Sequence, residues 1–238
     1  MGVKFLSLLL IPSFIFAQKT IDVEKESGDV VGAGLFFTGS GAPYSPYKYV
    51  RVISGSPFFK EDWMKGVALL ENGNSARCNH MKLDLLSGEI IYKDSAGTEL
   101  TAISPIVRLT LTDSISGKDY VFINTSTARS SGKRSNDGWY LLLESGTASL
   151  YKKIKKTIRE SQPYNSGVTE QTIDTKNLYF LEISNEFTAV KKLNDISSAL
   201  TDKKIELDKF IDASKLNGKT EMDFISVVAK YNDLAVNK

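Results

Sequence analysis

The 238-residue chain has very little of the side chains on which most catalytic and metal sites depend. It contains one cysteine, Cys78, and one histidine, His80. A single cysteine excludes a disulfide within the chain and a zinc site built from several thiolates. Cys78 and His80 lie two residues apart on an expected strand, so their side chains would share a face, in poor geometry for proton transfer. We therefore name no catalytic or metal-binding residue and expect no cofactor.

An excess of charge of one sign is also lacking. The chain has 30 lysines and arginines against 28 aspartates and glutamates, a formal net charge of +2. No strong field is available to gather nucleic acid, and we expect no nucleic-acid partner. The number of carboxylates leaves a glycan hydrolase activity possible, because such an enzyme needs only two carboxylates that are correctly spaced. No cluster in the sequence indicates which two those would be.

The longest apolar run is short and lies at the start of the chain, from Phe5 to Phe16, after Lys4 and before Ala17. This layout is typical of a secretory signal peptide over residues 1–17, cleaved after Ala17. The run is too short for a stable bilayer-spanning helix, although an uncleaved anchor or a buried helix is an alternative. We expect an exported mature chain without a transmembrane span, located in the periplasm, at the outer membrane or outside the cell.

Between Gly66 and Glu144, short apolar segments are separated by tight-turn signals. Asn72-Gly73 predicts a type I′ hairpin turn, in which both central residues have positive φ. Repeated turns at this spacing favour antiparallel neighbours over βαβ units. For residues 18–190 we predict an antiparallel β domain, within a mainly β, α+β fold. Its meander would curl into a sandwich or a partly open barrel.

The segment Leu150–Arg159 contains the one dense group of basic residues, and we predict that it forms a strand ending at a sheet edge. Lysines at an edge discourage aggregation between sheets, or they could contact anionic lipid or acidic polysaccharide. The five candidate binding residues are Lys152, Lys153, Lys155, Lys156 and Arg159.

Beyond this segment we predict a polar loop over residues 160–176, and then a last hairpin about Ser184-Asn185. In residues 191–238, the apolar residues recur with the period of a helix. Asp202 could cap one helix, and Thr220–Asp223 resembles the capping box of another. Two or three helices are expected there, packed on the β domain.

An aromatic stretch precedes the central strands. Such rings most often close one end of a β core, but they can also form a platform for sugars or a protein partner. The candidate binding residues of this kind are Tyr44, Tyr47, Phe58, Phe59 and Trp63. Two turns, Asp94-Ser95-Ala96 and Asp113-Ser114-Ile115, resemble the Asp-Ser acceptor motif for O-glycosylation in some Gram-negative bacteria. Ser95 and Ser114 are therefore possible modification sites.

The layout resembles an uncharacterised family of exported β-meander proteins of Gram-negative bacteria. The resemblance rests on Gly55–Gly66 leading into the Asn72-Gly73 hairpin, on Leu150–Lys153, and on the helical ending Asp202–Tyr231. The family has no assigned activity, so the resemblance implies export and a meander followed by helices, and it transfers no functional residue.

Three functional hypotheses follow. The first is a non-catalytic binding or structural protein of the cell envelope, with a protein, lipid or glycan partner. The second is a carrier of a small apolar or lipid-like ligand in a barrel cavity. The third is the carboxylate-dependent glycan hydrolase. The oligomeric state stays open.

Overall fold

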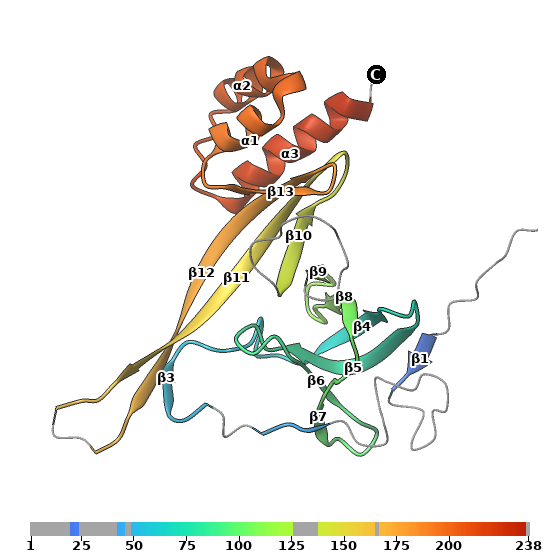
Figure 1. Ribbon diagram of the computed structural model, residues 1–238, viewed down its shortest axis with the longest axis vertical. Coiled ribbons are helices and arrows are strands. Elements are labelled where there is room, and N and C mark those ends of the chain that lie inside the picture. The colour runs from blue at the N-terminus through green and yellow to red at the C-terminus, as the bar shows by residue number, and fades with distance from the viewer. Residues whose placement is uncertain (1–19, 24–41, 46–48, 126–137, 165–166, 237–238) are drawn as a thin grey trace, which may run out of the picture.

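The computed structural model describes residues 20–23, 42–45, 49–125, 138–164 and 167–236, and within them one large sheet is followed by three α-helices (Figure 1). The expected signal segment, residues 1–17, and Tyr47 lie outside the described residues. The strands are β1 (Thr20–Asp22), β2 (Ala42–Pro43), β3 (Val52–Ser54), β4 (Met64–Leu70), β5 (Ser75–Leu83), β6 (Ile90–Lys93), β7 (Glu99–Thr101), β8 (Ile106–Thr112), β9 (Asp119–Asn124), β10 (Trp139–Glu144), β11 (Ala148–Ser161), β12 (Glu170–Ile183) and β13 (Glu186–Val190).

The sheet has the meander order that the repeated turns predict. Its path is β13-β12-β11-β10-β9-β8-β4-β5-β6-β7-β2, and each step along this path is antiparallel. Two short strands join in parallel, β1 to β5 and β3 to β12. The mainly β, mostly antiparallel character is confirmed. The sheet is open, with β13 and β2 at the two ends of its path.

The hairpin at Asn72-Gly73 is present, but the predicted turn type is wrong. Leu70 N donates to Asn74 O at 2.8 Å and Gly73 N donates to Leu70 O at 3.0 Å. Gly73 has φ +85°, whereas Asn72 is not among the residues with positive φ. One residue in the left-handed region after a type I turn makes a three-residue loop with a glycine bulge. Only Gly73 therefore needs the freedom of glycine.

A bulge in β5 overturns the expectation that Cys78 and His80 share a face. Met64 pairs with Met81 and Gly66 pairs with Cys78, so two steps along β4 oppose three steps along β5. The extra residue shifts the alternation, which buries Cys78 and leaves His80 exposed. The Cys78 thiol donates to the carbonyl oxygens of His80 and Lys93, both at 3.4 Å. Cys78 and His80 thus face different surroundings.

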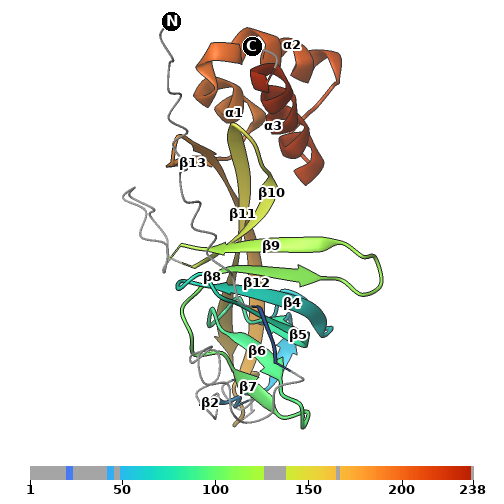
Figure 2. The same cartoon turned by 90° about the vertical axis from the view of Figure 1, so that its right-hand side faces the viewer.

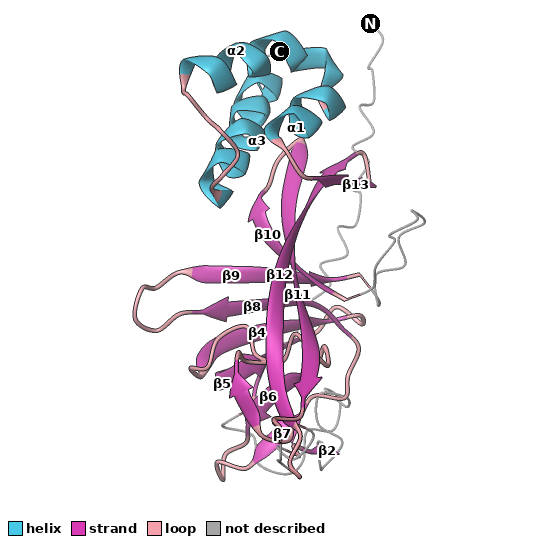
Figure 3. Cartoon of the chain, turned by 90° about the vertical axis from the view of Figure 1, so that its left-hand side faces the viewer, coloured by secondary structure: helices cyan, strands magenta, loops and turns pink. Residues whose placement is uncertain are grey.

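The predicted loop over residues 160–176 is also wrong in part, because β12 begins at Glu170. β11 and β12 pair along all fourteen residues of each strand, from Ala148 with Ile183 to Ser161 with Glu170. At about 3.4 Å per residue, such a strand is roughly 45 Å long. Figure 3 shows this hairpin running along the molecule and crossing the direction of β8 and β9. The turn at Ser184-Asn185, where both residues have positive φ, is confirmed.

Besides a small cluster of Tyr140, Tyr151 and Phe180 on β10, β11 and β12, the hairpin connects two larger cores. One lies within β4, β5, β6, β8, β9 and the start of β10, and it includes Met81, Leu109 and Phe122. The other forms where the helices pack on β11, β12 and β13, and it includes Leu150 and Leu181. The helices are α1 (Leu193–Ala199), α2 (Lys204–Ala213) and α3 (Glu221–Val236), with the short 3-10 helix η2 (Thr201–Lys203) between α1 and α2.

One buried side-chain amide, that of Asn232, helps to attach helix α3 to the sheet. Asn232 accepts from Ala148 N at 2.9 Å and donates to Ala148 O at 3.0 Å, so both backbone groups at the start of β11 are satisfied. Gly146 lets this side chain approach, because a Cβ there would lie 2.4 Å from Asn232 Cγ. The predicted cap at Thr220 is confirmed, since Asp223 N donates to Thr220 Oγ1 at 3.2 Å. Asp202, by contrast, does not cap α2, whose N-cap residue is Lys203.

Candidate binding cleft at the fork between β10 and β11

The sheet divides where β10 and β11 separate. β10 pairs with β11 as far as Leu141 with Lys152, and it pairs with β9 from Leu141 back to Trp139. Beyond Lys152, β12 is the one partner of β11 among the described strands, so the pair β9–β10 diverges from the pair β11–β12 (Figure 1). The fork that they form opens a space beside the middle of β11.

A cleft of about 350 Å³ occupies this fork. One wall comes from the turn between β5 and β6, a second from the ends of β9 and β10, and a third from β11. The residues that line it are Leu85, Leu86, Ser87, Gly88, Asn124, Gly138, Trp139, Lys153, Ile154, Lys155 and Lys156.

The cleft lies along the edge of β11 and not over one of its faces. Lys153, Ile154, Lys155 and Lys156 are consecutive, and all four line it. Side chains on a strand point alternately to opposite faces, so a space over one face would meet only every second residue. A space that meets four in a row must lie beside the strand, where its backbone is also within reach.

The turn wall is held in place by partly buried hydrogen bonds to Asp84 and from Trp139. Asp84 is fully buried, and its Oδ1 accepts from the backbone N–H groups of Leu86 and Ser87, both at 2.9 Å. Its Oδ2 accepts from the Tyr49 hydroxyl at 2.5 Å. Burial, and then this bond to Asp84, raise the pKa of Tyr49. Trp139 Nε1 donates to Gly88 O at 2.9 Å, which joins the turn to β10. The wall is thus preorganised.

The cleft is basic and contains no carboxylate among its described lining residues. The Lys153 ammonium lies 5.1 Å from the centre of the Tyr140 ring, in a cation–π contact. Lys155 is exposed. Lys156 Nζ donates to Thr175 Oγ1 at 3.0 Å, and burial lowers the pKa of Lys156, while Glu61 acts in the opposite direction. The ammonium groups of Lys153 and Lys155, with the apolar side chains of Trp139 and Ile154, suit an anionic ligand that has an apolar part.

The predicted basic residues thus divide into two groups. Lys153, Lys155 and Lys156 line the cleft, whereas Lys152 and Arg159 do not. Lys152 forms a salt bridge with Glu221 at 2.5 Å, beside the Tyr179 hydroxyl, which donates to the same carboxylate oxygen at 3.2 Å. Arg159 forms an exposed bidentate pair with Asp174, at 3.0 and 3.2 Å. Lys152 therefore helps to dock α3, and Arg159 braces the outer part of the hairpin.

The predicted aromatic residues do not gather at the cleft. Phe59 packs edge-on against Tyr120 and Phe122, both with ring centres 4.9 Å away, and joins the β core. Trp63 and Phe58 lie on the surface beside lysines. Lys82 and Lys93 are each 4.7 Å from the Trp63 ring, and Lys82 is 5.1 Å from the Phe58 ring. Tyr44 is half-buried, and its N–H donates to Glu99 O at 3.2 Å.

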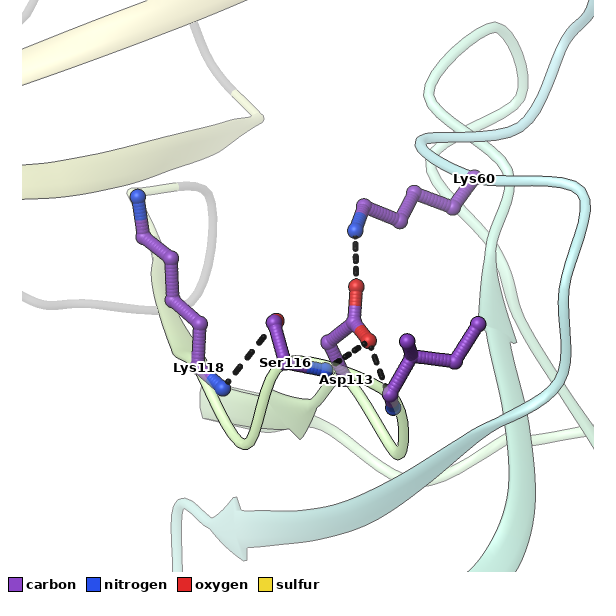
Figure 4. Close-up of polar contacts among 5 residues, drawn as sticks. Lys60, Asp113, Ser116 and Lys118 are labelled. Atoms are coloured by element: carbon purple, nitrogen blue, oxygen red, sulfur yellow. Dashed lines mark hydrogen bonds and ion pairs between the residues drawn. The ribbon is translucent and has the colours of Figure 1, made fainter.

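The two serines proposed for glycosylation are both exposed at hairpin turns. Asp94 Oδ1 accepts from two backbone N–H groups in the turn that contains Ser95. Asp113 does the same in the turn that contains Ser114, and its other oxygen accepts from Lys60 (Figure 4). In this motif the aspartate therefore shapes the turn. Modification of either serine stays a prediction.

Trp139, Asn124 and the Leu85–Gly88 turn are cleft residues that the sequence interpretation missed. A signal for the turn was present, since Asp84 and Gly88 recur at the same spacing as Asp113 and Gly117. For Trp139 and Asn124 no local signal existed, because the fork brings them to β11 from other strands.

No family model, no curated protein and no solved structure matches this chain. The resemblance to the exported β-meander family stays a prediction. Across the part of the chain that the structure describes, no helix combines the length and apolarity needed to cross a bilayer. The same residues contain no group of three or more histidine, cysteine, aspartate or glutamate side chains placed to hold a metal ion.

Proposed function

We propose that this chain is an exported, non-catalytic binding protein of the bacterial cell envelope, which holds an acidic segment of a partner protein in the fork cleft. The observation that carries the proposal is that Lys153, Lys155 and Lys156 all line one preorganised cleft with an apolar floor. Export is supported by the signal-like residues 1–17.

A polypeptide suits the cleft better than a lipid or a glycan. The space runs beside a strand, so a ligand there meets regularly spaced backbone groups as well as ammonium groups. Lipid headgroups and uronic acids supply the negative charge but have no matching row of amides. The cleft's chemistry therefore favours an acidic peptide.

The two other hypotheses have less support. A carrier needs the sheet to curl into a sandwich or partly open barrel around a hollow, whereas the path of the sheet is open and both cores are filled with buried side chains. A glycan hydrolase needs two facing carboxylates, and the described lining of the cleft has none.

The test is binding of a labelled ten-residue peptide of alternating glutamate and valine to the mature chain, measured by fluorescence anisotropy at low salt. We expect Lys155→Glu to weaken binding by about tenfold, because it reverses a charge at the cleft. Lys209→Glu is the charge-matched control, since Lys209 is exposed on α2 and does not line the cleft. It should change binding less than twofold.

Two further probes make the result decisive. Polygalacturonate and phosphatidylglycerol vesicles are offered under the same conditions. If either binds in a way that depends on Lys155 while the peptide does not, the partner is a glycan or a membrane and the proposal is wrong. Equal effects of Lys155→Glu and Lys209→Glu would contradict the placement of the site.

A further inference from the structure

The edge of β11 remains open beyond the fork. β11 pairs with β12 along its whole length, but with β10 only from Leu150 to Lys152. Among the described strands, none pairs with the other side of β11 from residue 154 to residue 161. In a strand with one neighbour, alternate residues direct their N–H and C=O groups away from that neighbour. These groups form a template for an additional strand.

The two faces of this edge differ in chemistry. Lys153 and Lys155 lie on one face, whereas Ile154 and Ile158 lie on the other. Ile154 packs against the β core, and Ile158 is 38% exposed. Lys156 shares the second face, but its ammonium is directed to Thr175 on β12, away from the open edge.

We propose that the occupant of the cleft is an extended polypeptide strand of alternating acidic and apolar side chains, which pairs with the open edge of β11 from residue 154 onward. This inference rests on the proposed function and specifies how its ligand is held. Side chains directly opposite on paired strands share a face. The acidic residue opposite Lys155 then lies beside Lys155 and, diagonally, beside Lys153, and apolar residues lie opposite Ile154 and Ile158.

The length of the open edge supports an added strand over a single anchoring residue. The cleft covers β11 only as far as Lys156, and the unpaired edge continues for several residues beyond it. The turn wall on the opposite side of the cleft, held by Asp84, gives a fixed boundary against which a strand can lie. An extended segment can use the cleft and the edge together.

The test is a scan in which each residue of the alternating glutamate–valine peptide is N-methylated in turn, with the unaltered protein as receptor. An added strand donates only every second N–H to β11, so N-methylation should weaken binding by tenfold or more at alternate positions. At the positions between them, we expect a change of less than threefold. A peptide with five glutamates followed by five valines has the same composition and charge, and it should bind at least tenfold more weakly.

The outcomes separate this inference from the proposed function. If the peptide binds in a way that depends on Lys155, but the N-methyl scan is flat and the rearranged peptide binds equally well, then the cleft binds acidic peptides by charge alone and strand addition is wrong. If no acidic peptide binds, both proposals are overturned. A period of two in the scan, together with loss of binding in Lys155→Glu, supports both.

Discussion

Two turns of this protein have the same backbone and opposite surroundings. In the β5–β6 turn, Asp84 Oδ1 accepts from the residues two and three positions later, and Gly88 N donates to Asp84 O at 2.8 Å. In the β8–β9 turn, Asp113 accepts from the same two positions, and Gly117 N donates to Asp113 O at 2.8 Å. In both turns, the glycine has positive φ.

The difference lies in what surrounds each turn. Asp84 is fully buried, Leu85 packs against the β core, and the turn forms a wall of the cleft. Asp113 instead pairs with Lys60, and Ile115 beside it is 94% exposed. Figure 2 shows the β8–β9 turn projecting from the side of the molecule. The same local motif therefore forms a wall of the cleft in the β5–β6 turn and an exposed, projecting loop in the β8–β9 turn.

Removing the buried aspartate should have the largest effect. In Asp84→Ala, the backbone N–H groups of Leu86 and Ser87 and the Tyr49 hydroxyl lose their acceptor, and loss of three hydrogen bonds to this buried side chain costs about 3 kcal/mol or more in total. Urea unfolding measures this loss of stability. Asp113→Ala is the matched control and should lose clearly less, because water can replace its carboxylate. Equal losses would show that the surroundings of the two turns do not matter.

The apolar residues of the turns should show the next largest difference. Leu85→Ala removes a half-buried side chain from the β core and should cost about 1–2 kcal/mol of unfolding free energy. Ile115→Ala changes a side chain in solvent and should stay within about 0.5 kcal/mol of the parent. Thermal unfolding of the two variants side by side checks this. A loss in Ile115→Ala as large as that in Leu85→Ala would mean that something covers the projecting turn.

The smallest expected effect is the pH dependence of the stability that Asp113 contributes in the exposed β8–β9 turn. Lys60 first, and then the N–H groups of Ser116 and Ile115, hold the pKa of Asp113 below its ordinary value. A folded-state pKa that is depressed adds stability above the unfolded pKa of about 3.9, and this stability is lost as the pH falls further. Asp113→Asn should therefore be less stable than the parent at pH 7.

Urea midpoints of Asp113→Asn and the parent, measured between pH 7 and pH 2.5, follow this difference. The difference in urea midpoint between the two proteins should decrease as the pH falls below about 4. Lys60→Met removes the first cause of the lowered Asp113 pKa. Its urea midpoint should therefore depend less on pH than that of the parent. A gap that is constant across the range would contradict the assigned role of the Asp113 carboxylate.

Much of the fold was readable from local patterns. The turn residues correctly indicated antiparallel neighbours, the position of Leu150–Arg159 after a strand and a turn indicated a further strand, and Thr220–Asp223 indicated a helix start. These signals succeeded because a turn, a strand and a cap each depend on a few adjacent residues. The same reasoning failed at Glu170–Lys176, since a polar stretch becomes a strand only when a partner as long as β11 is available.

The candidate site was only half predictable. The sequence by itself identified the basic residues of the cleft and determined the two aspartate turns, because charge and backbone geometry are local properties. Only the tertiary structure decided which lysines meet at the fork, which turn is buried, and that Lys152 docks a helix instead. Those outcomes depend on contacts between residues far apart in the chain, such as Trp139 Nε1 with Gly88 O and Lys152 with Glu221, and not on any short segment.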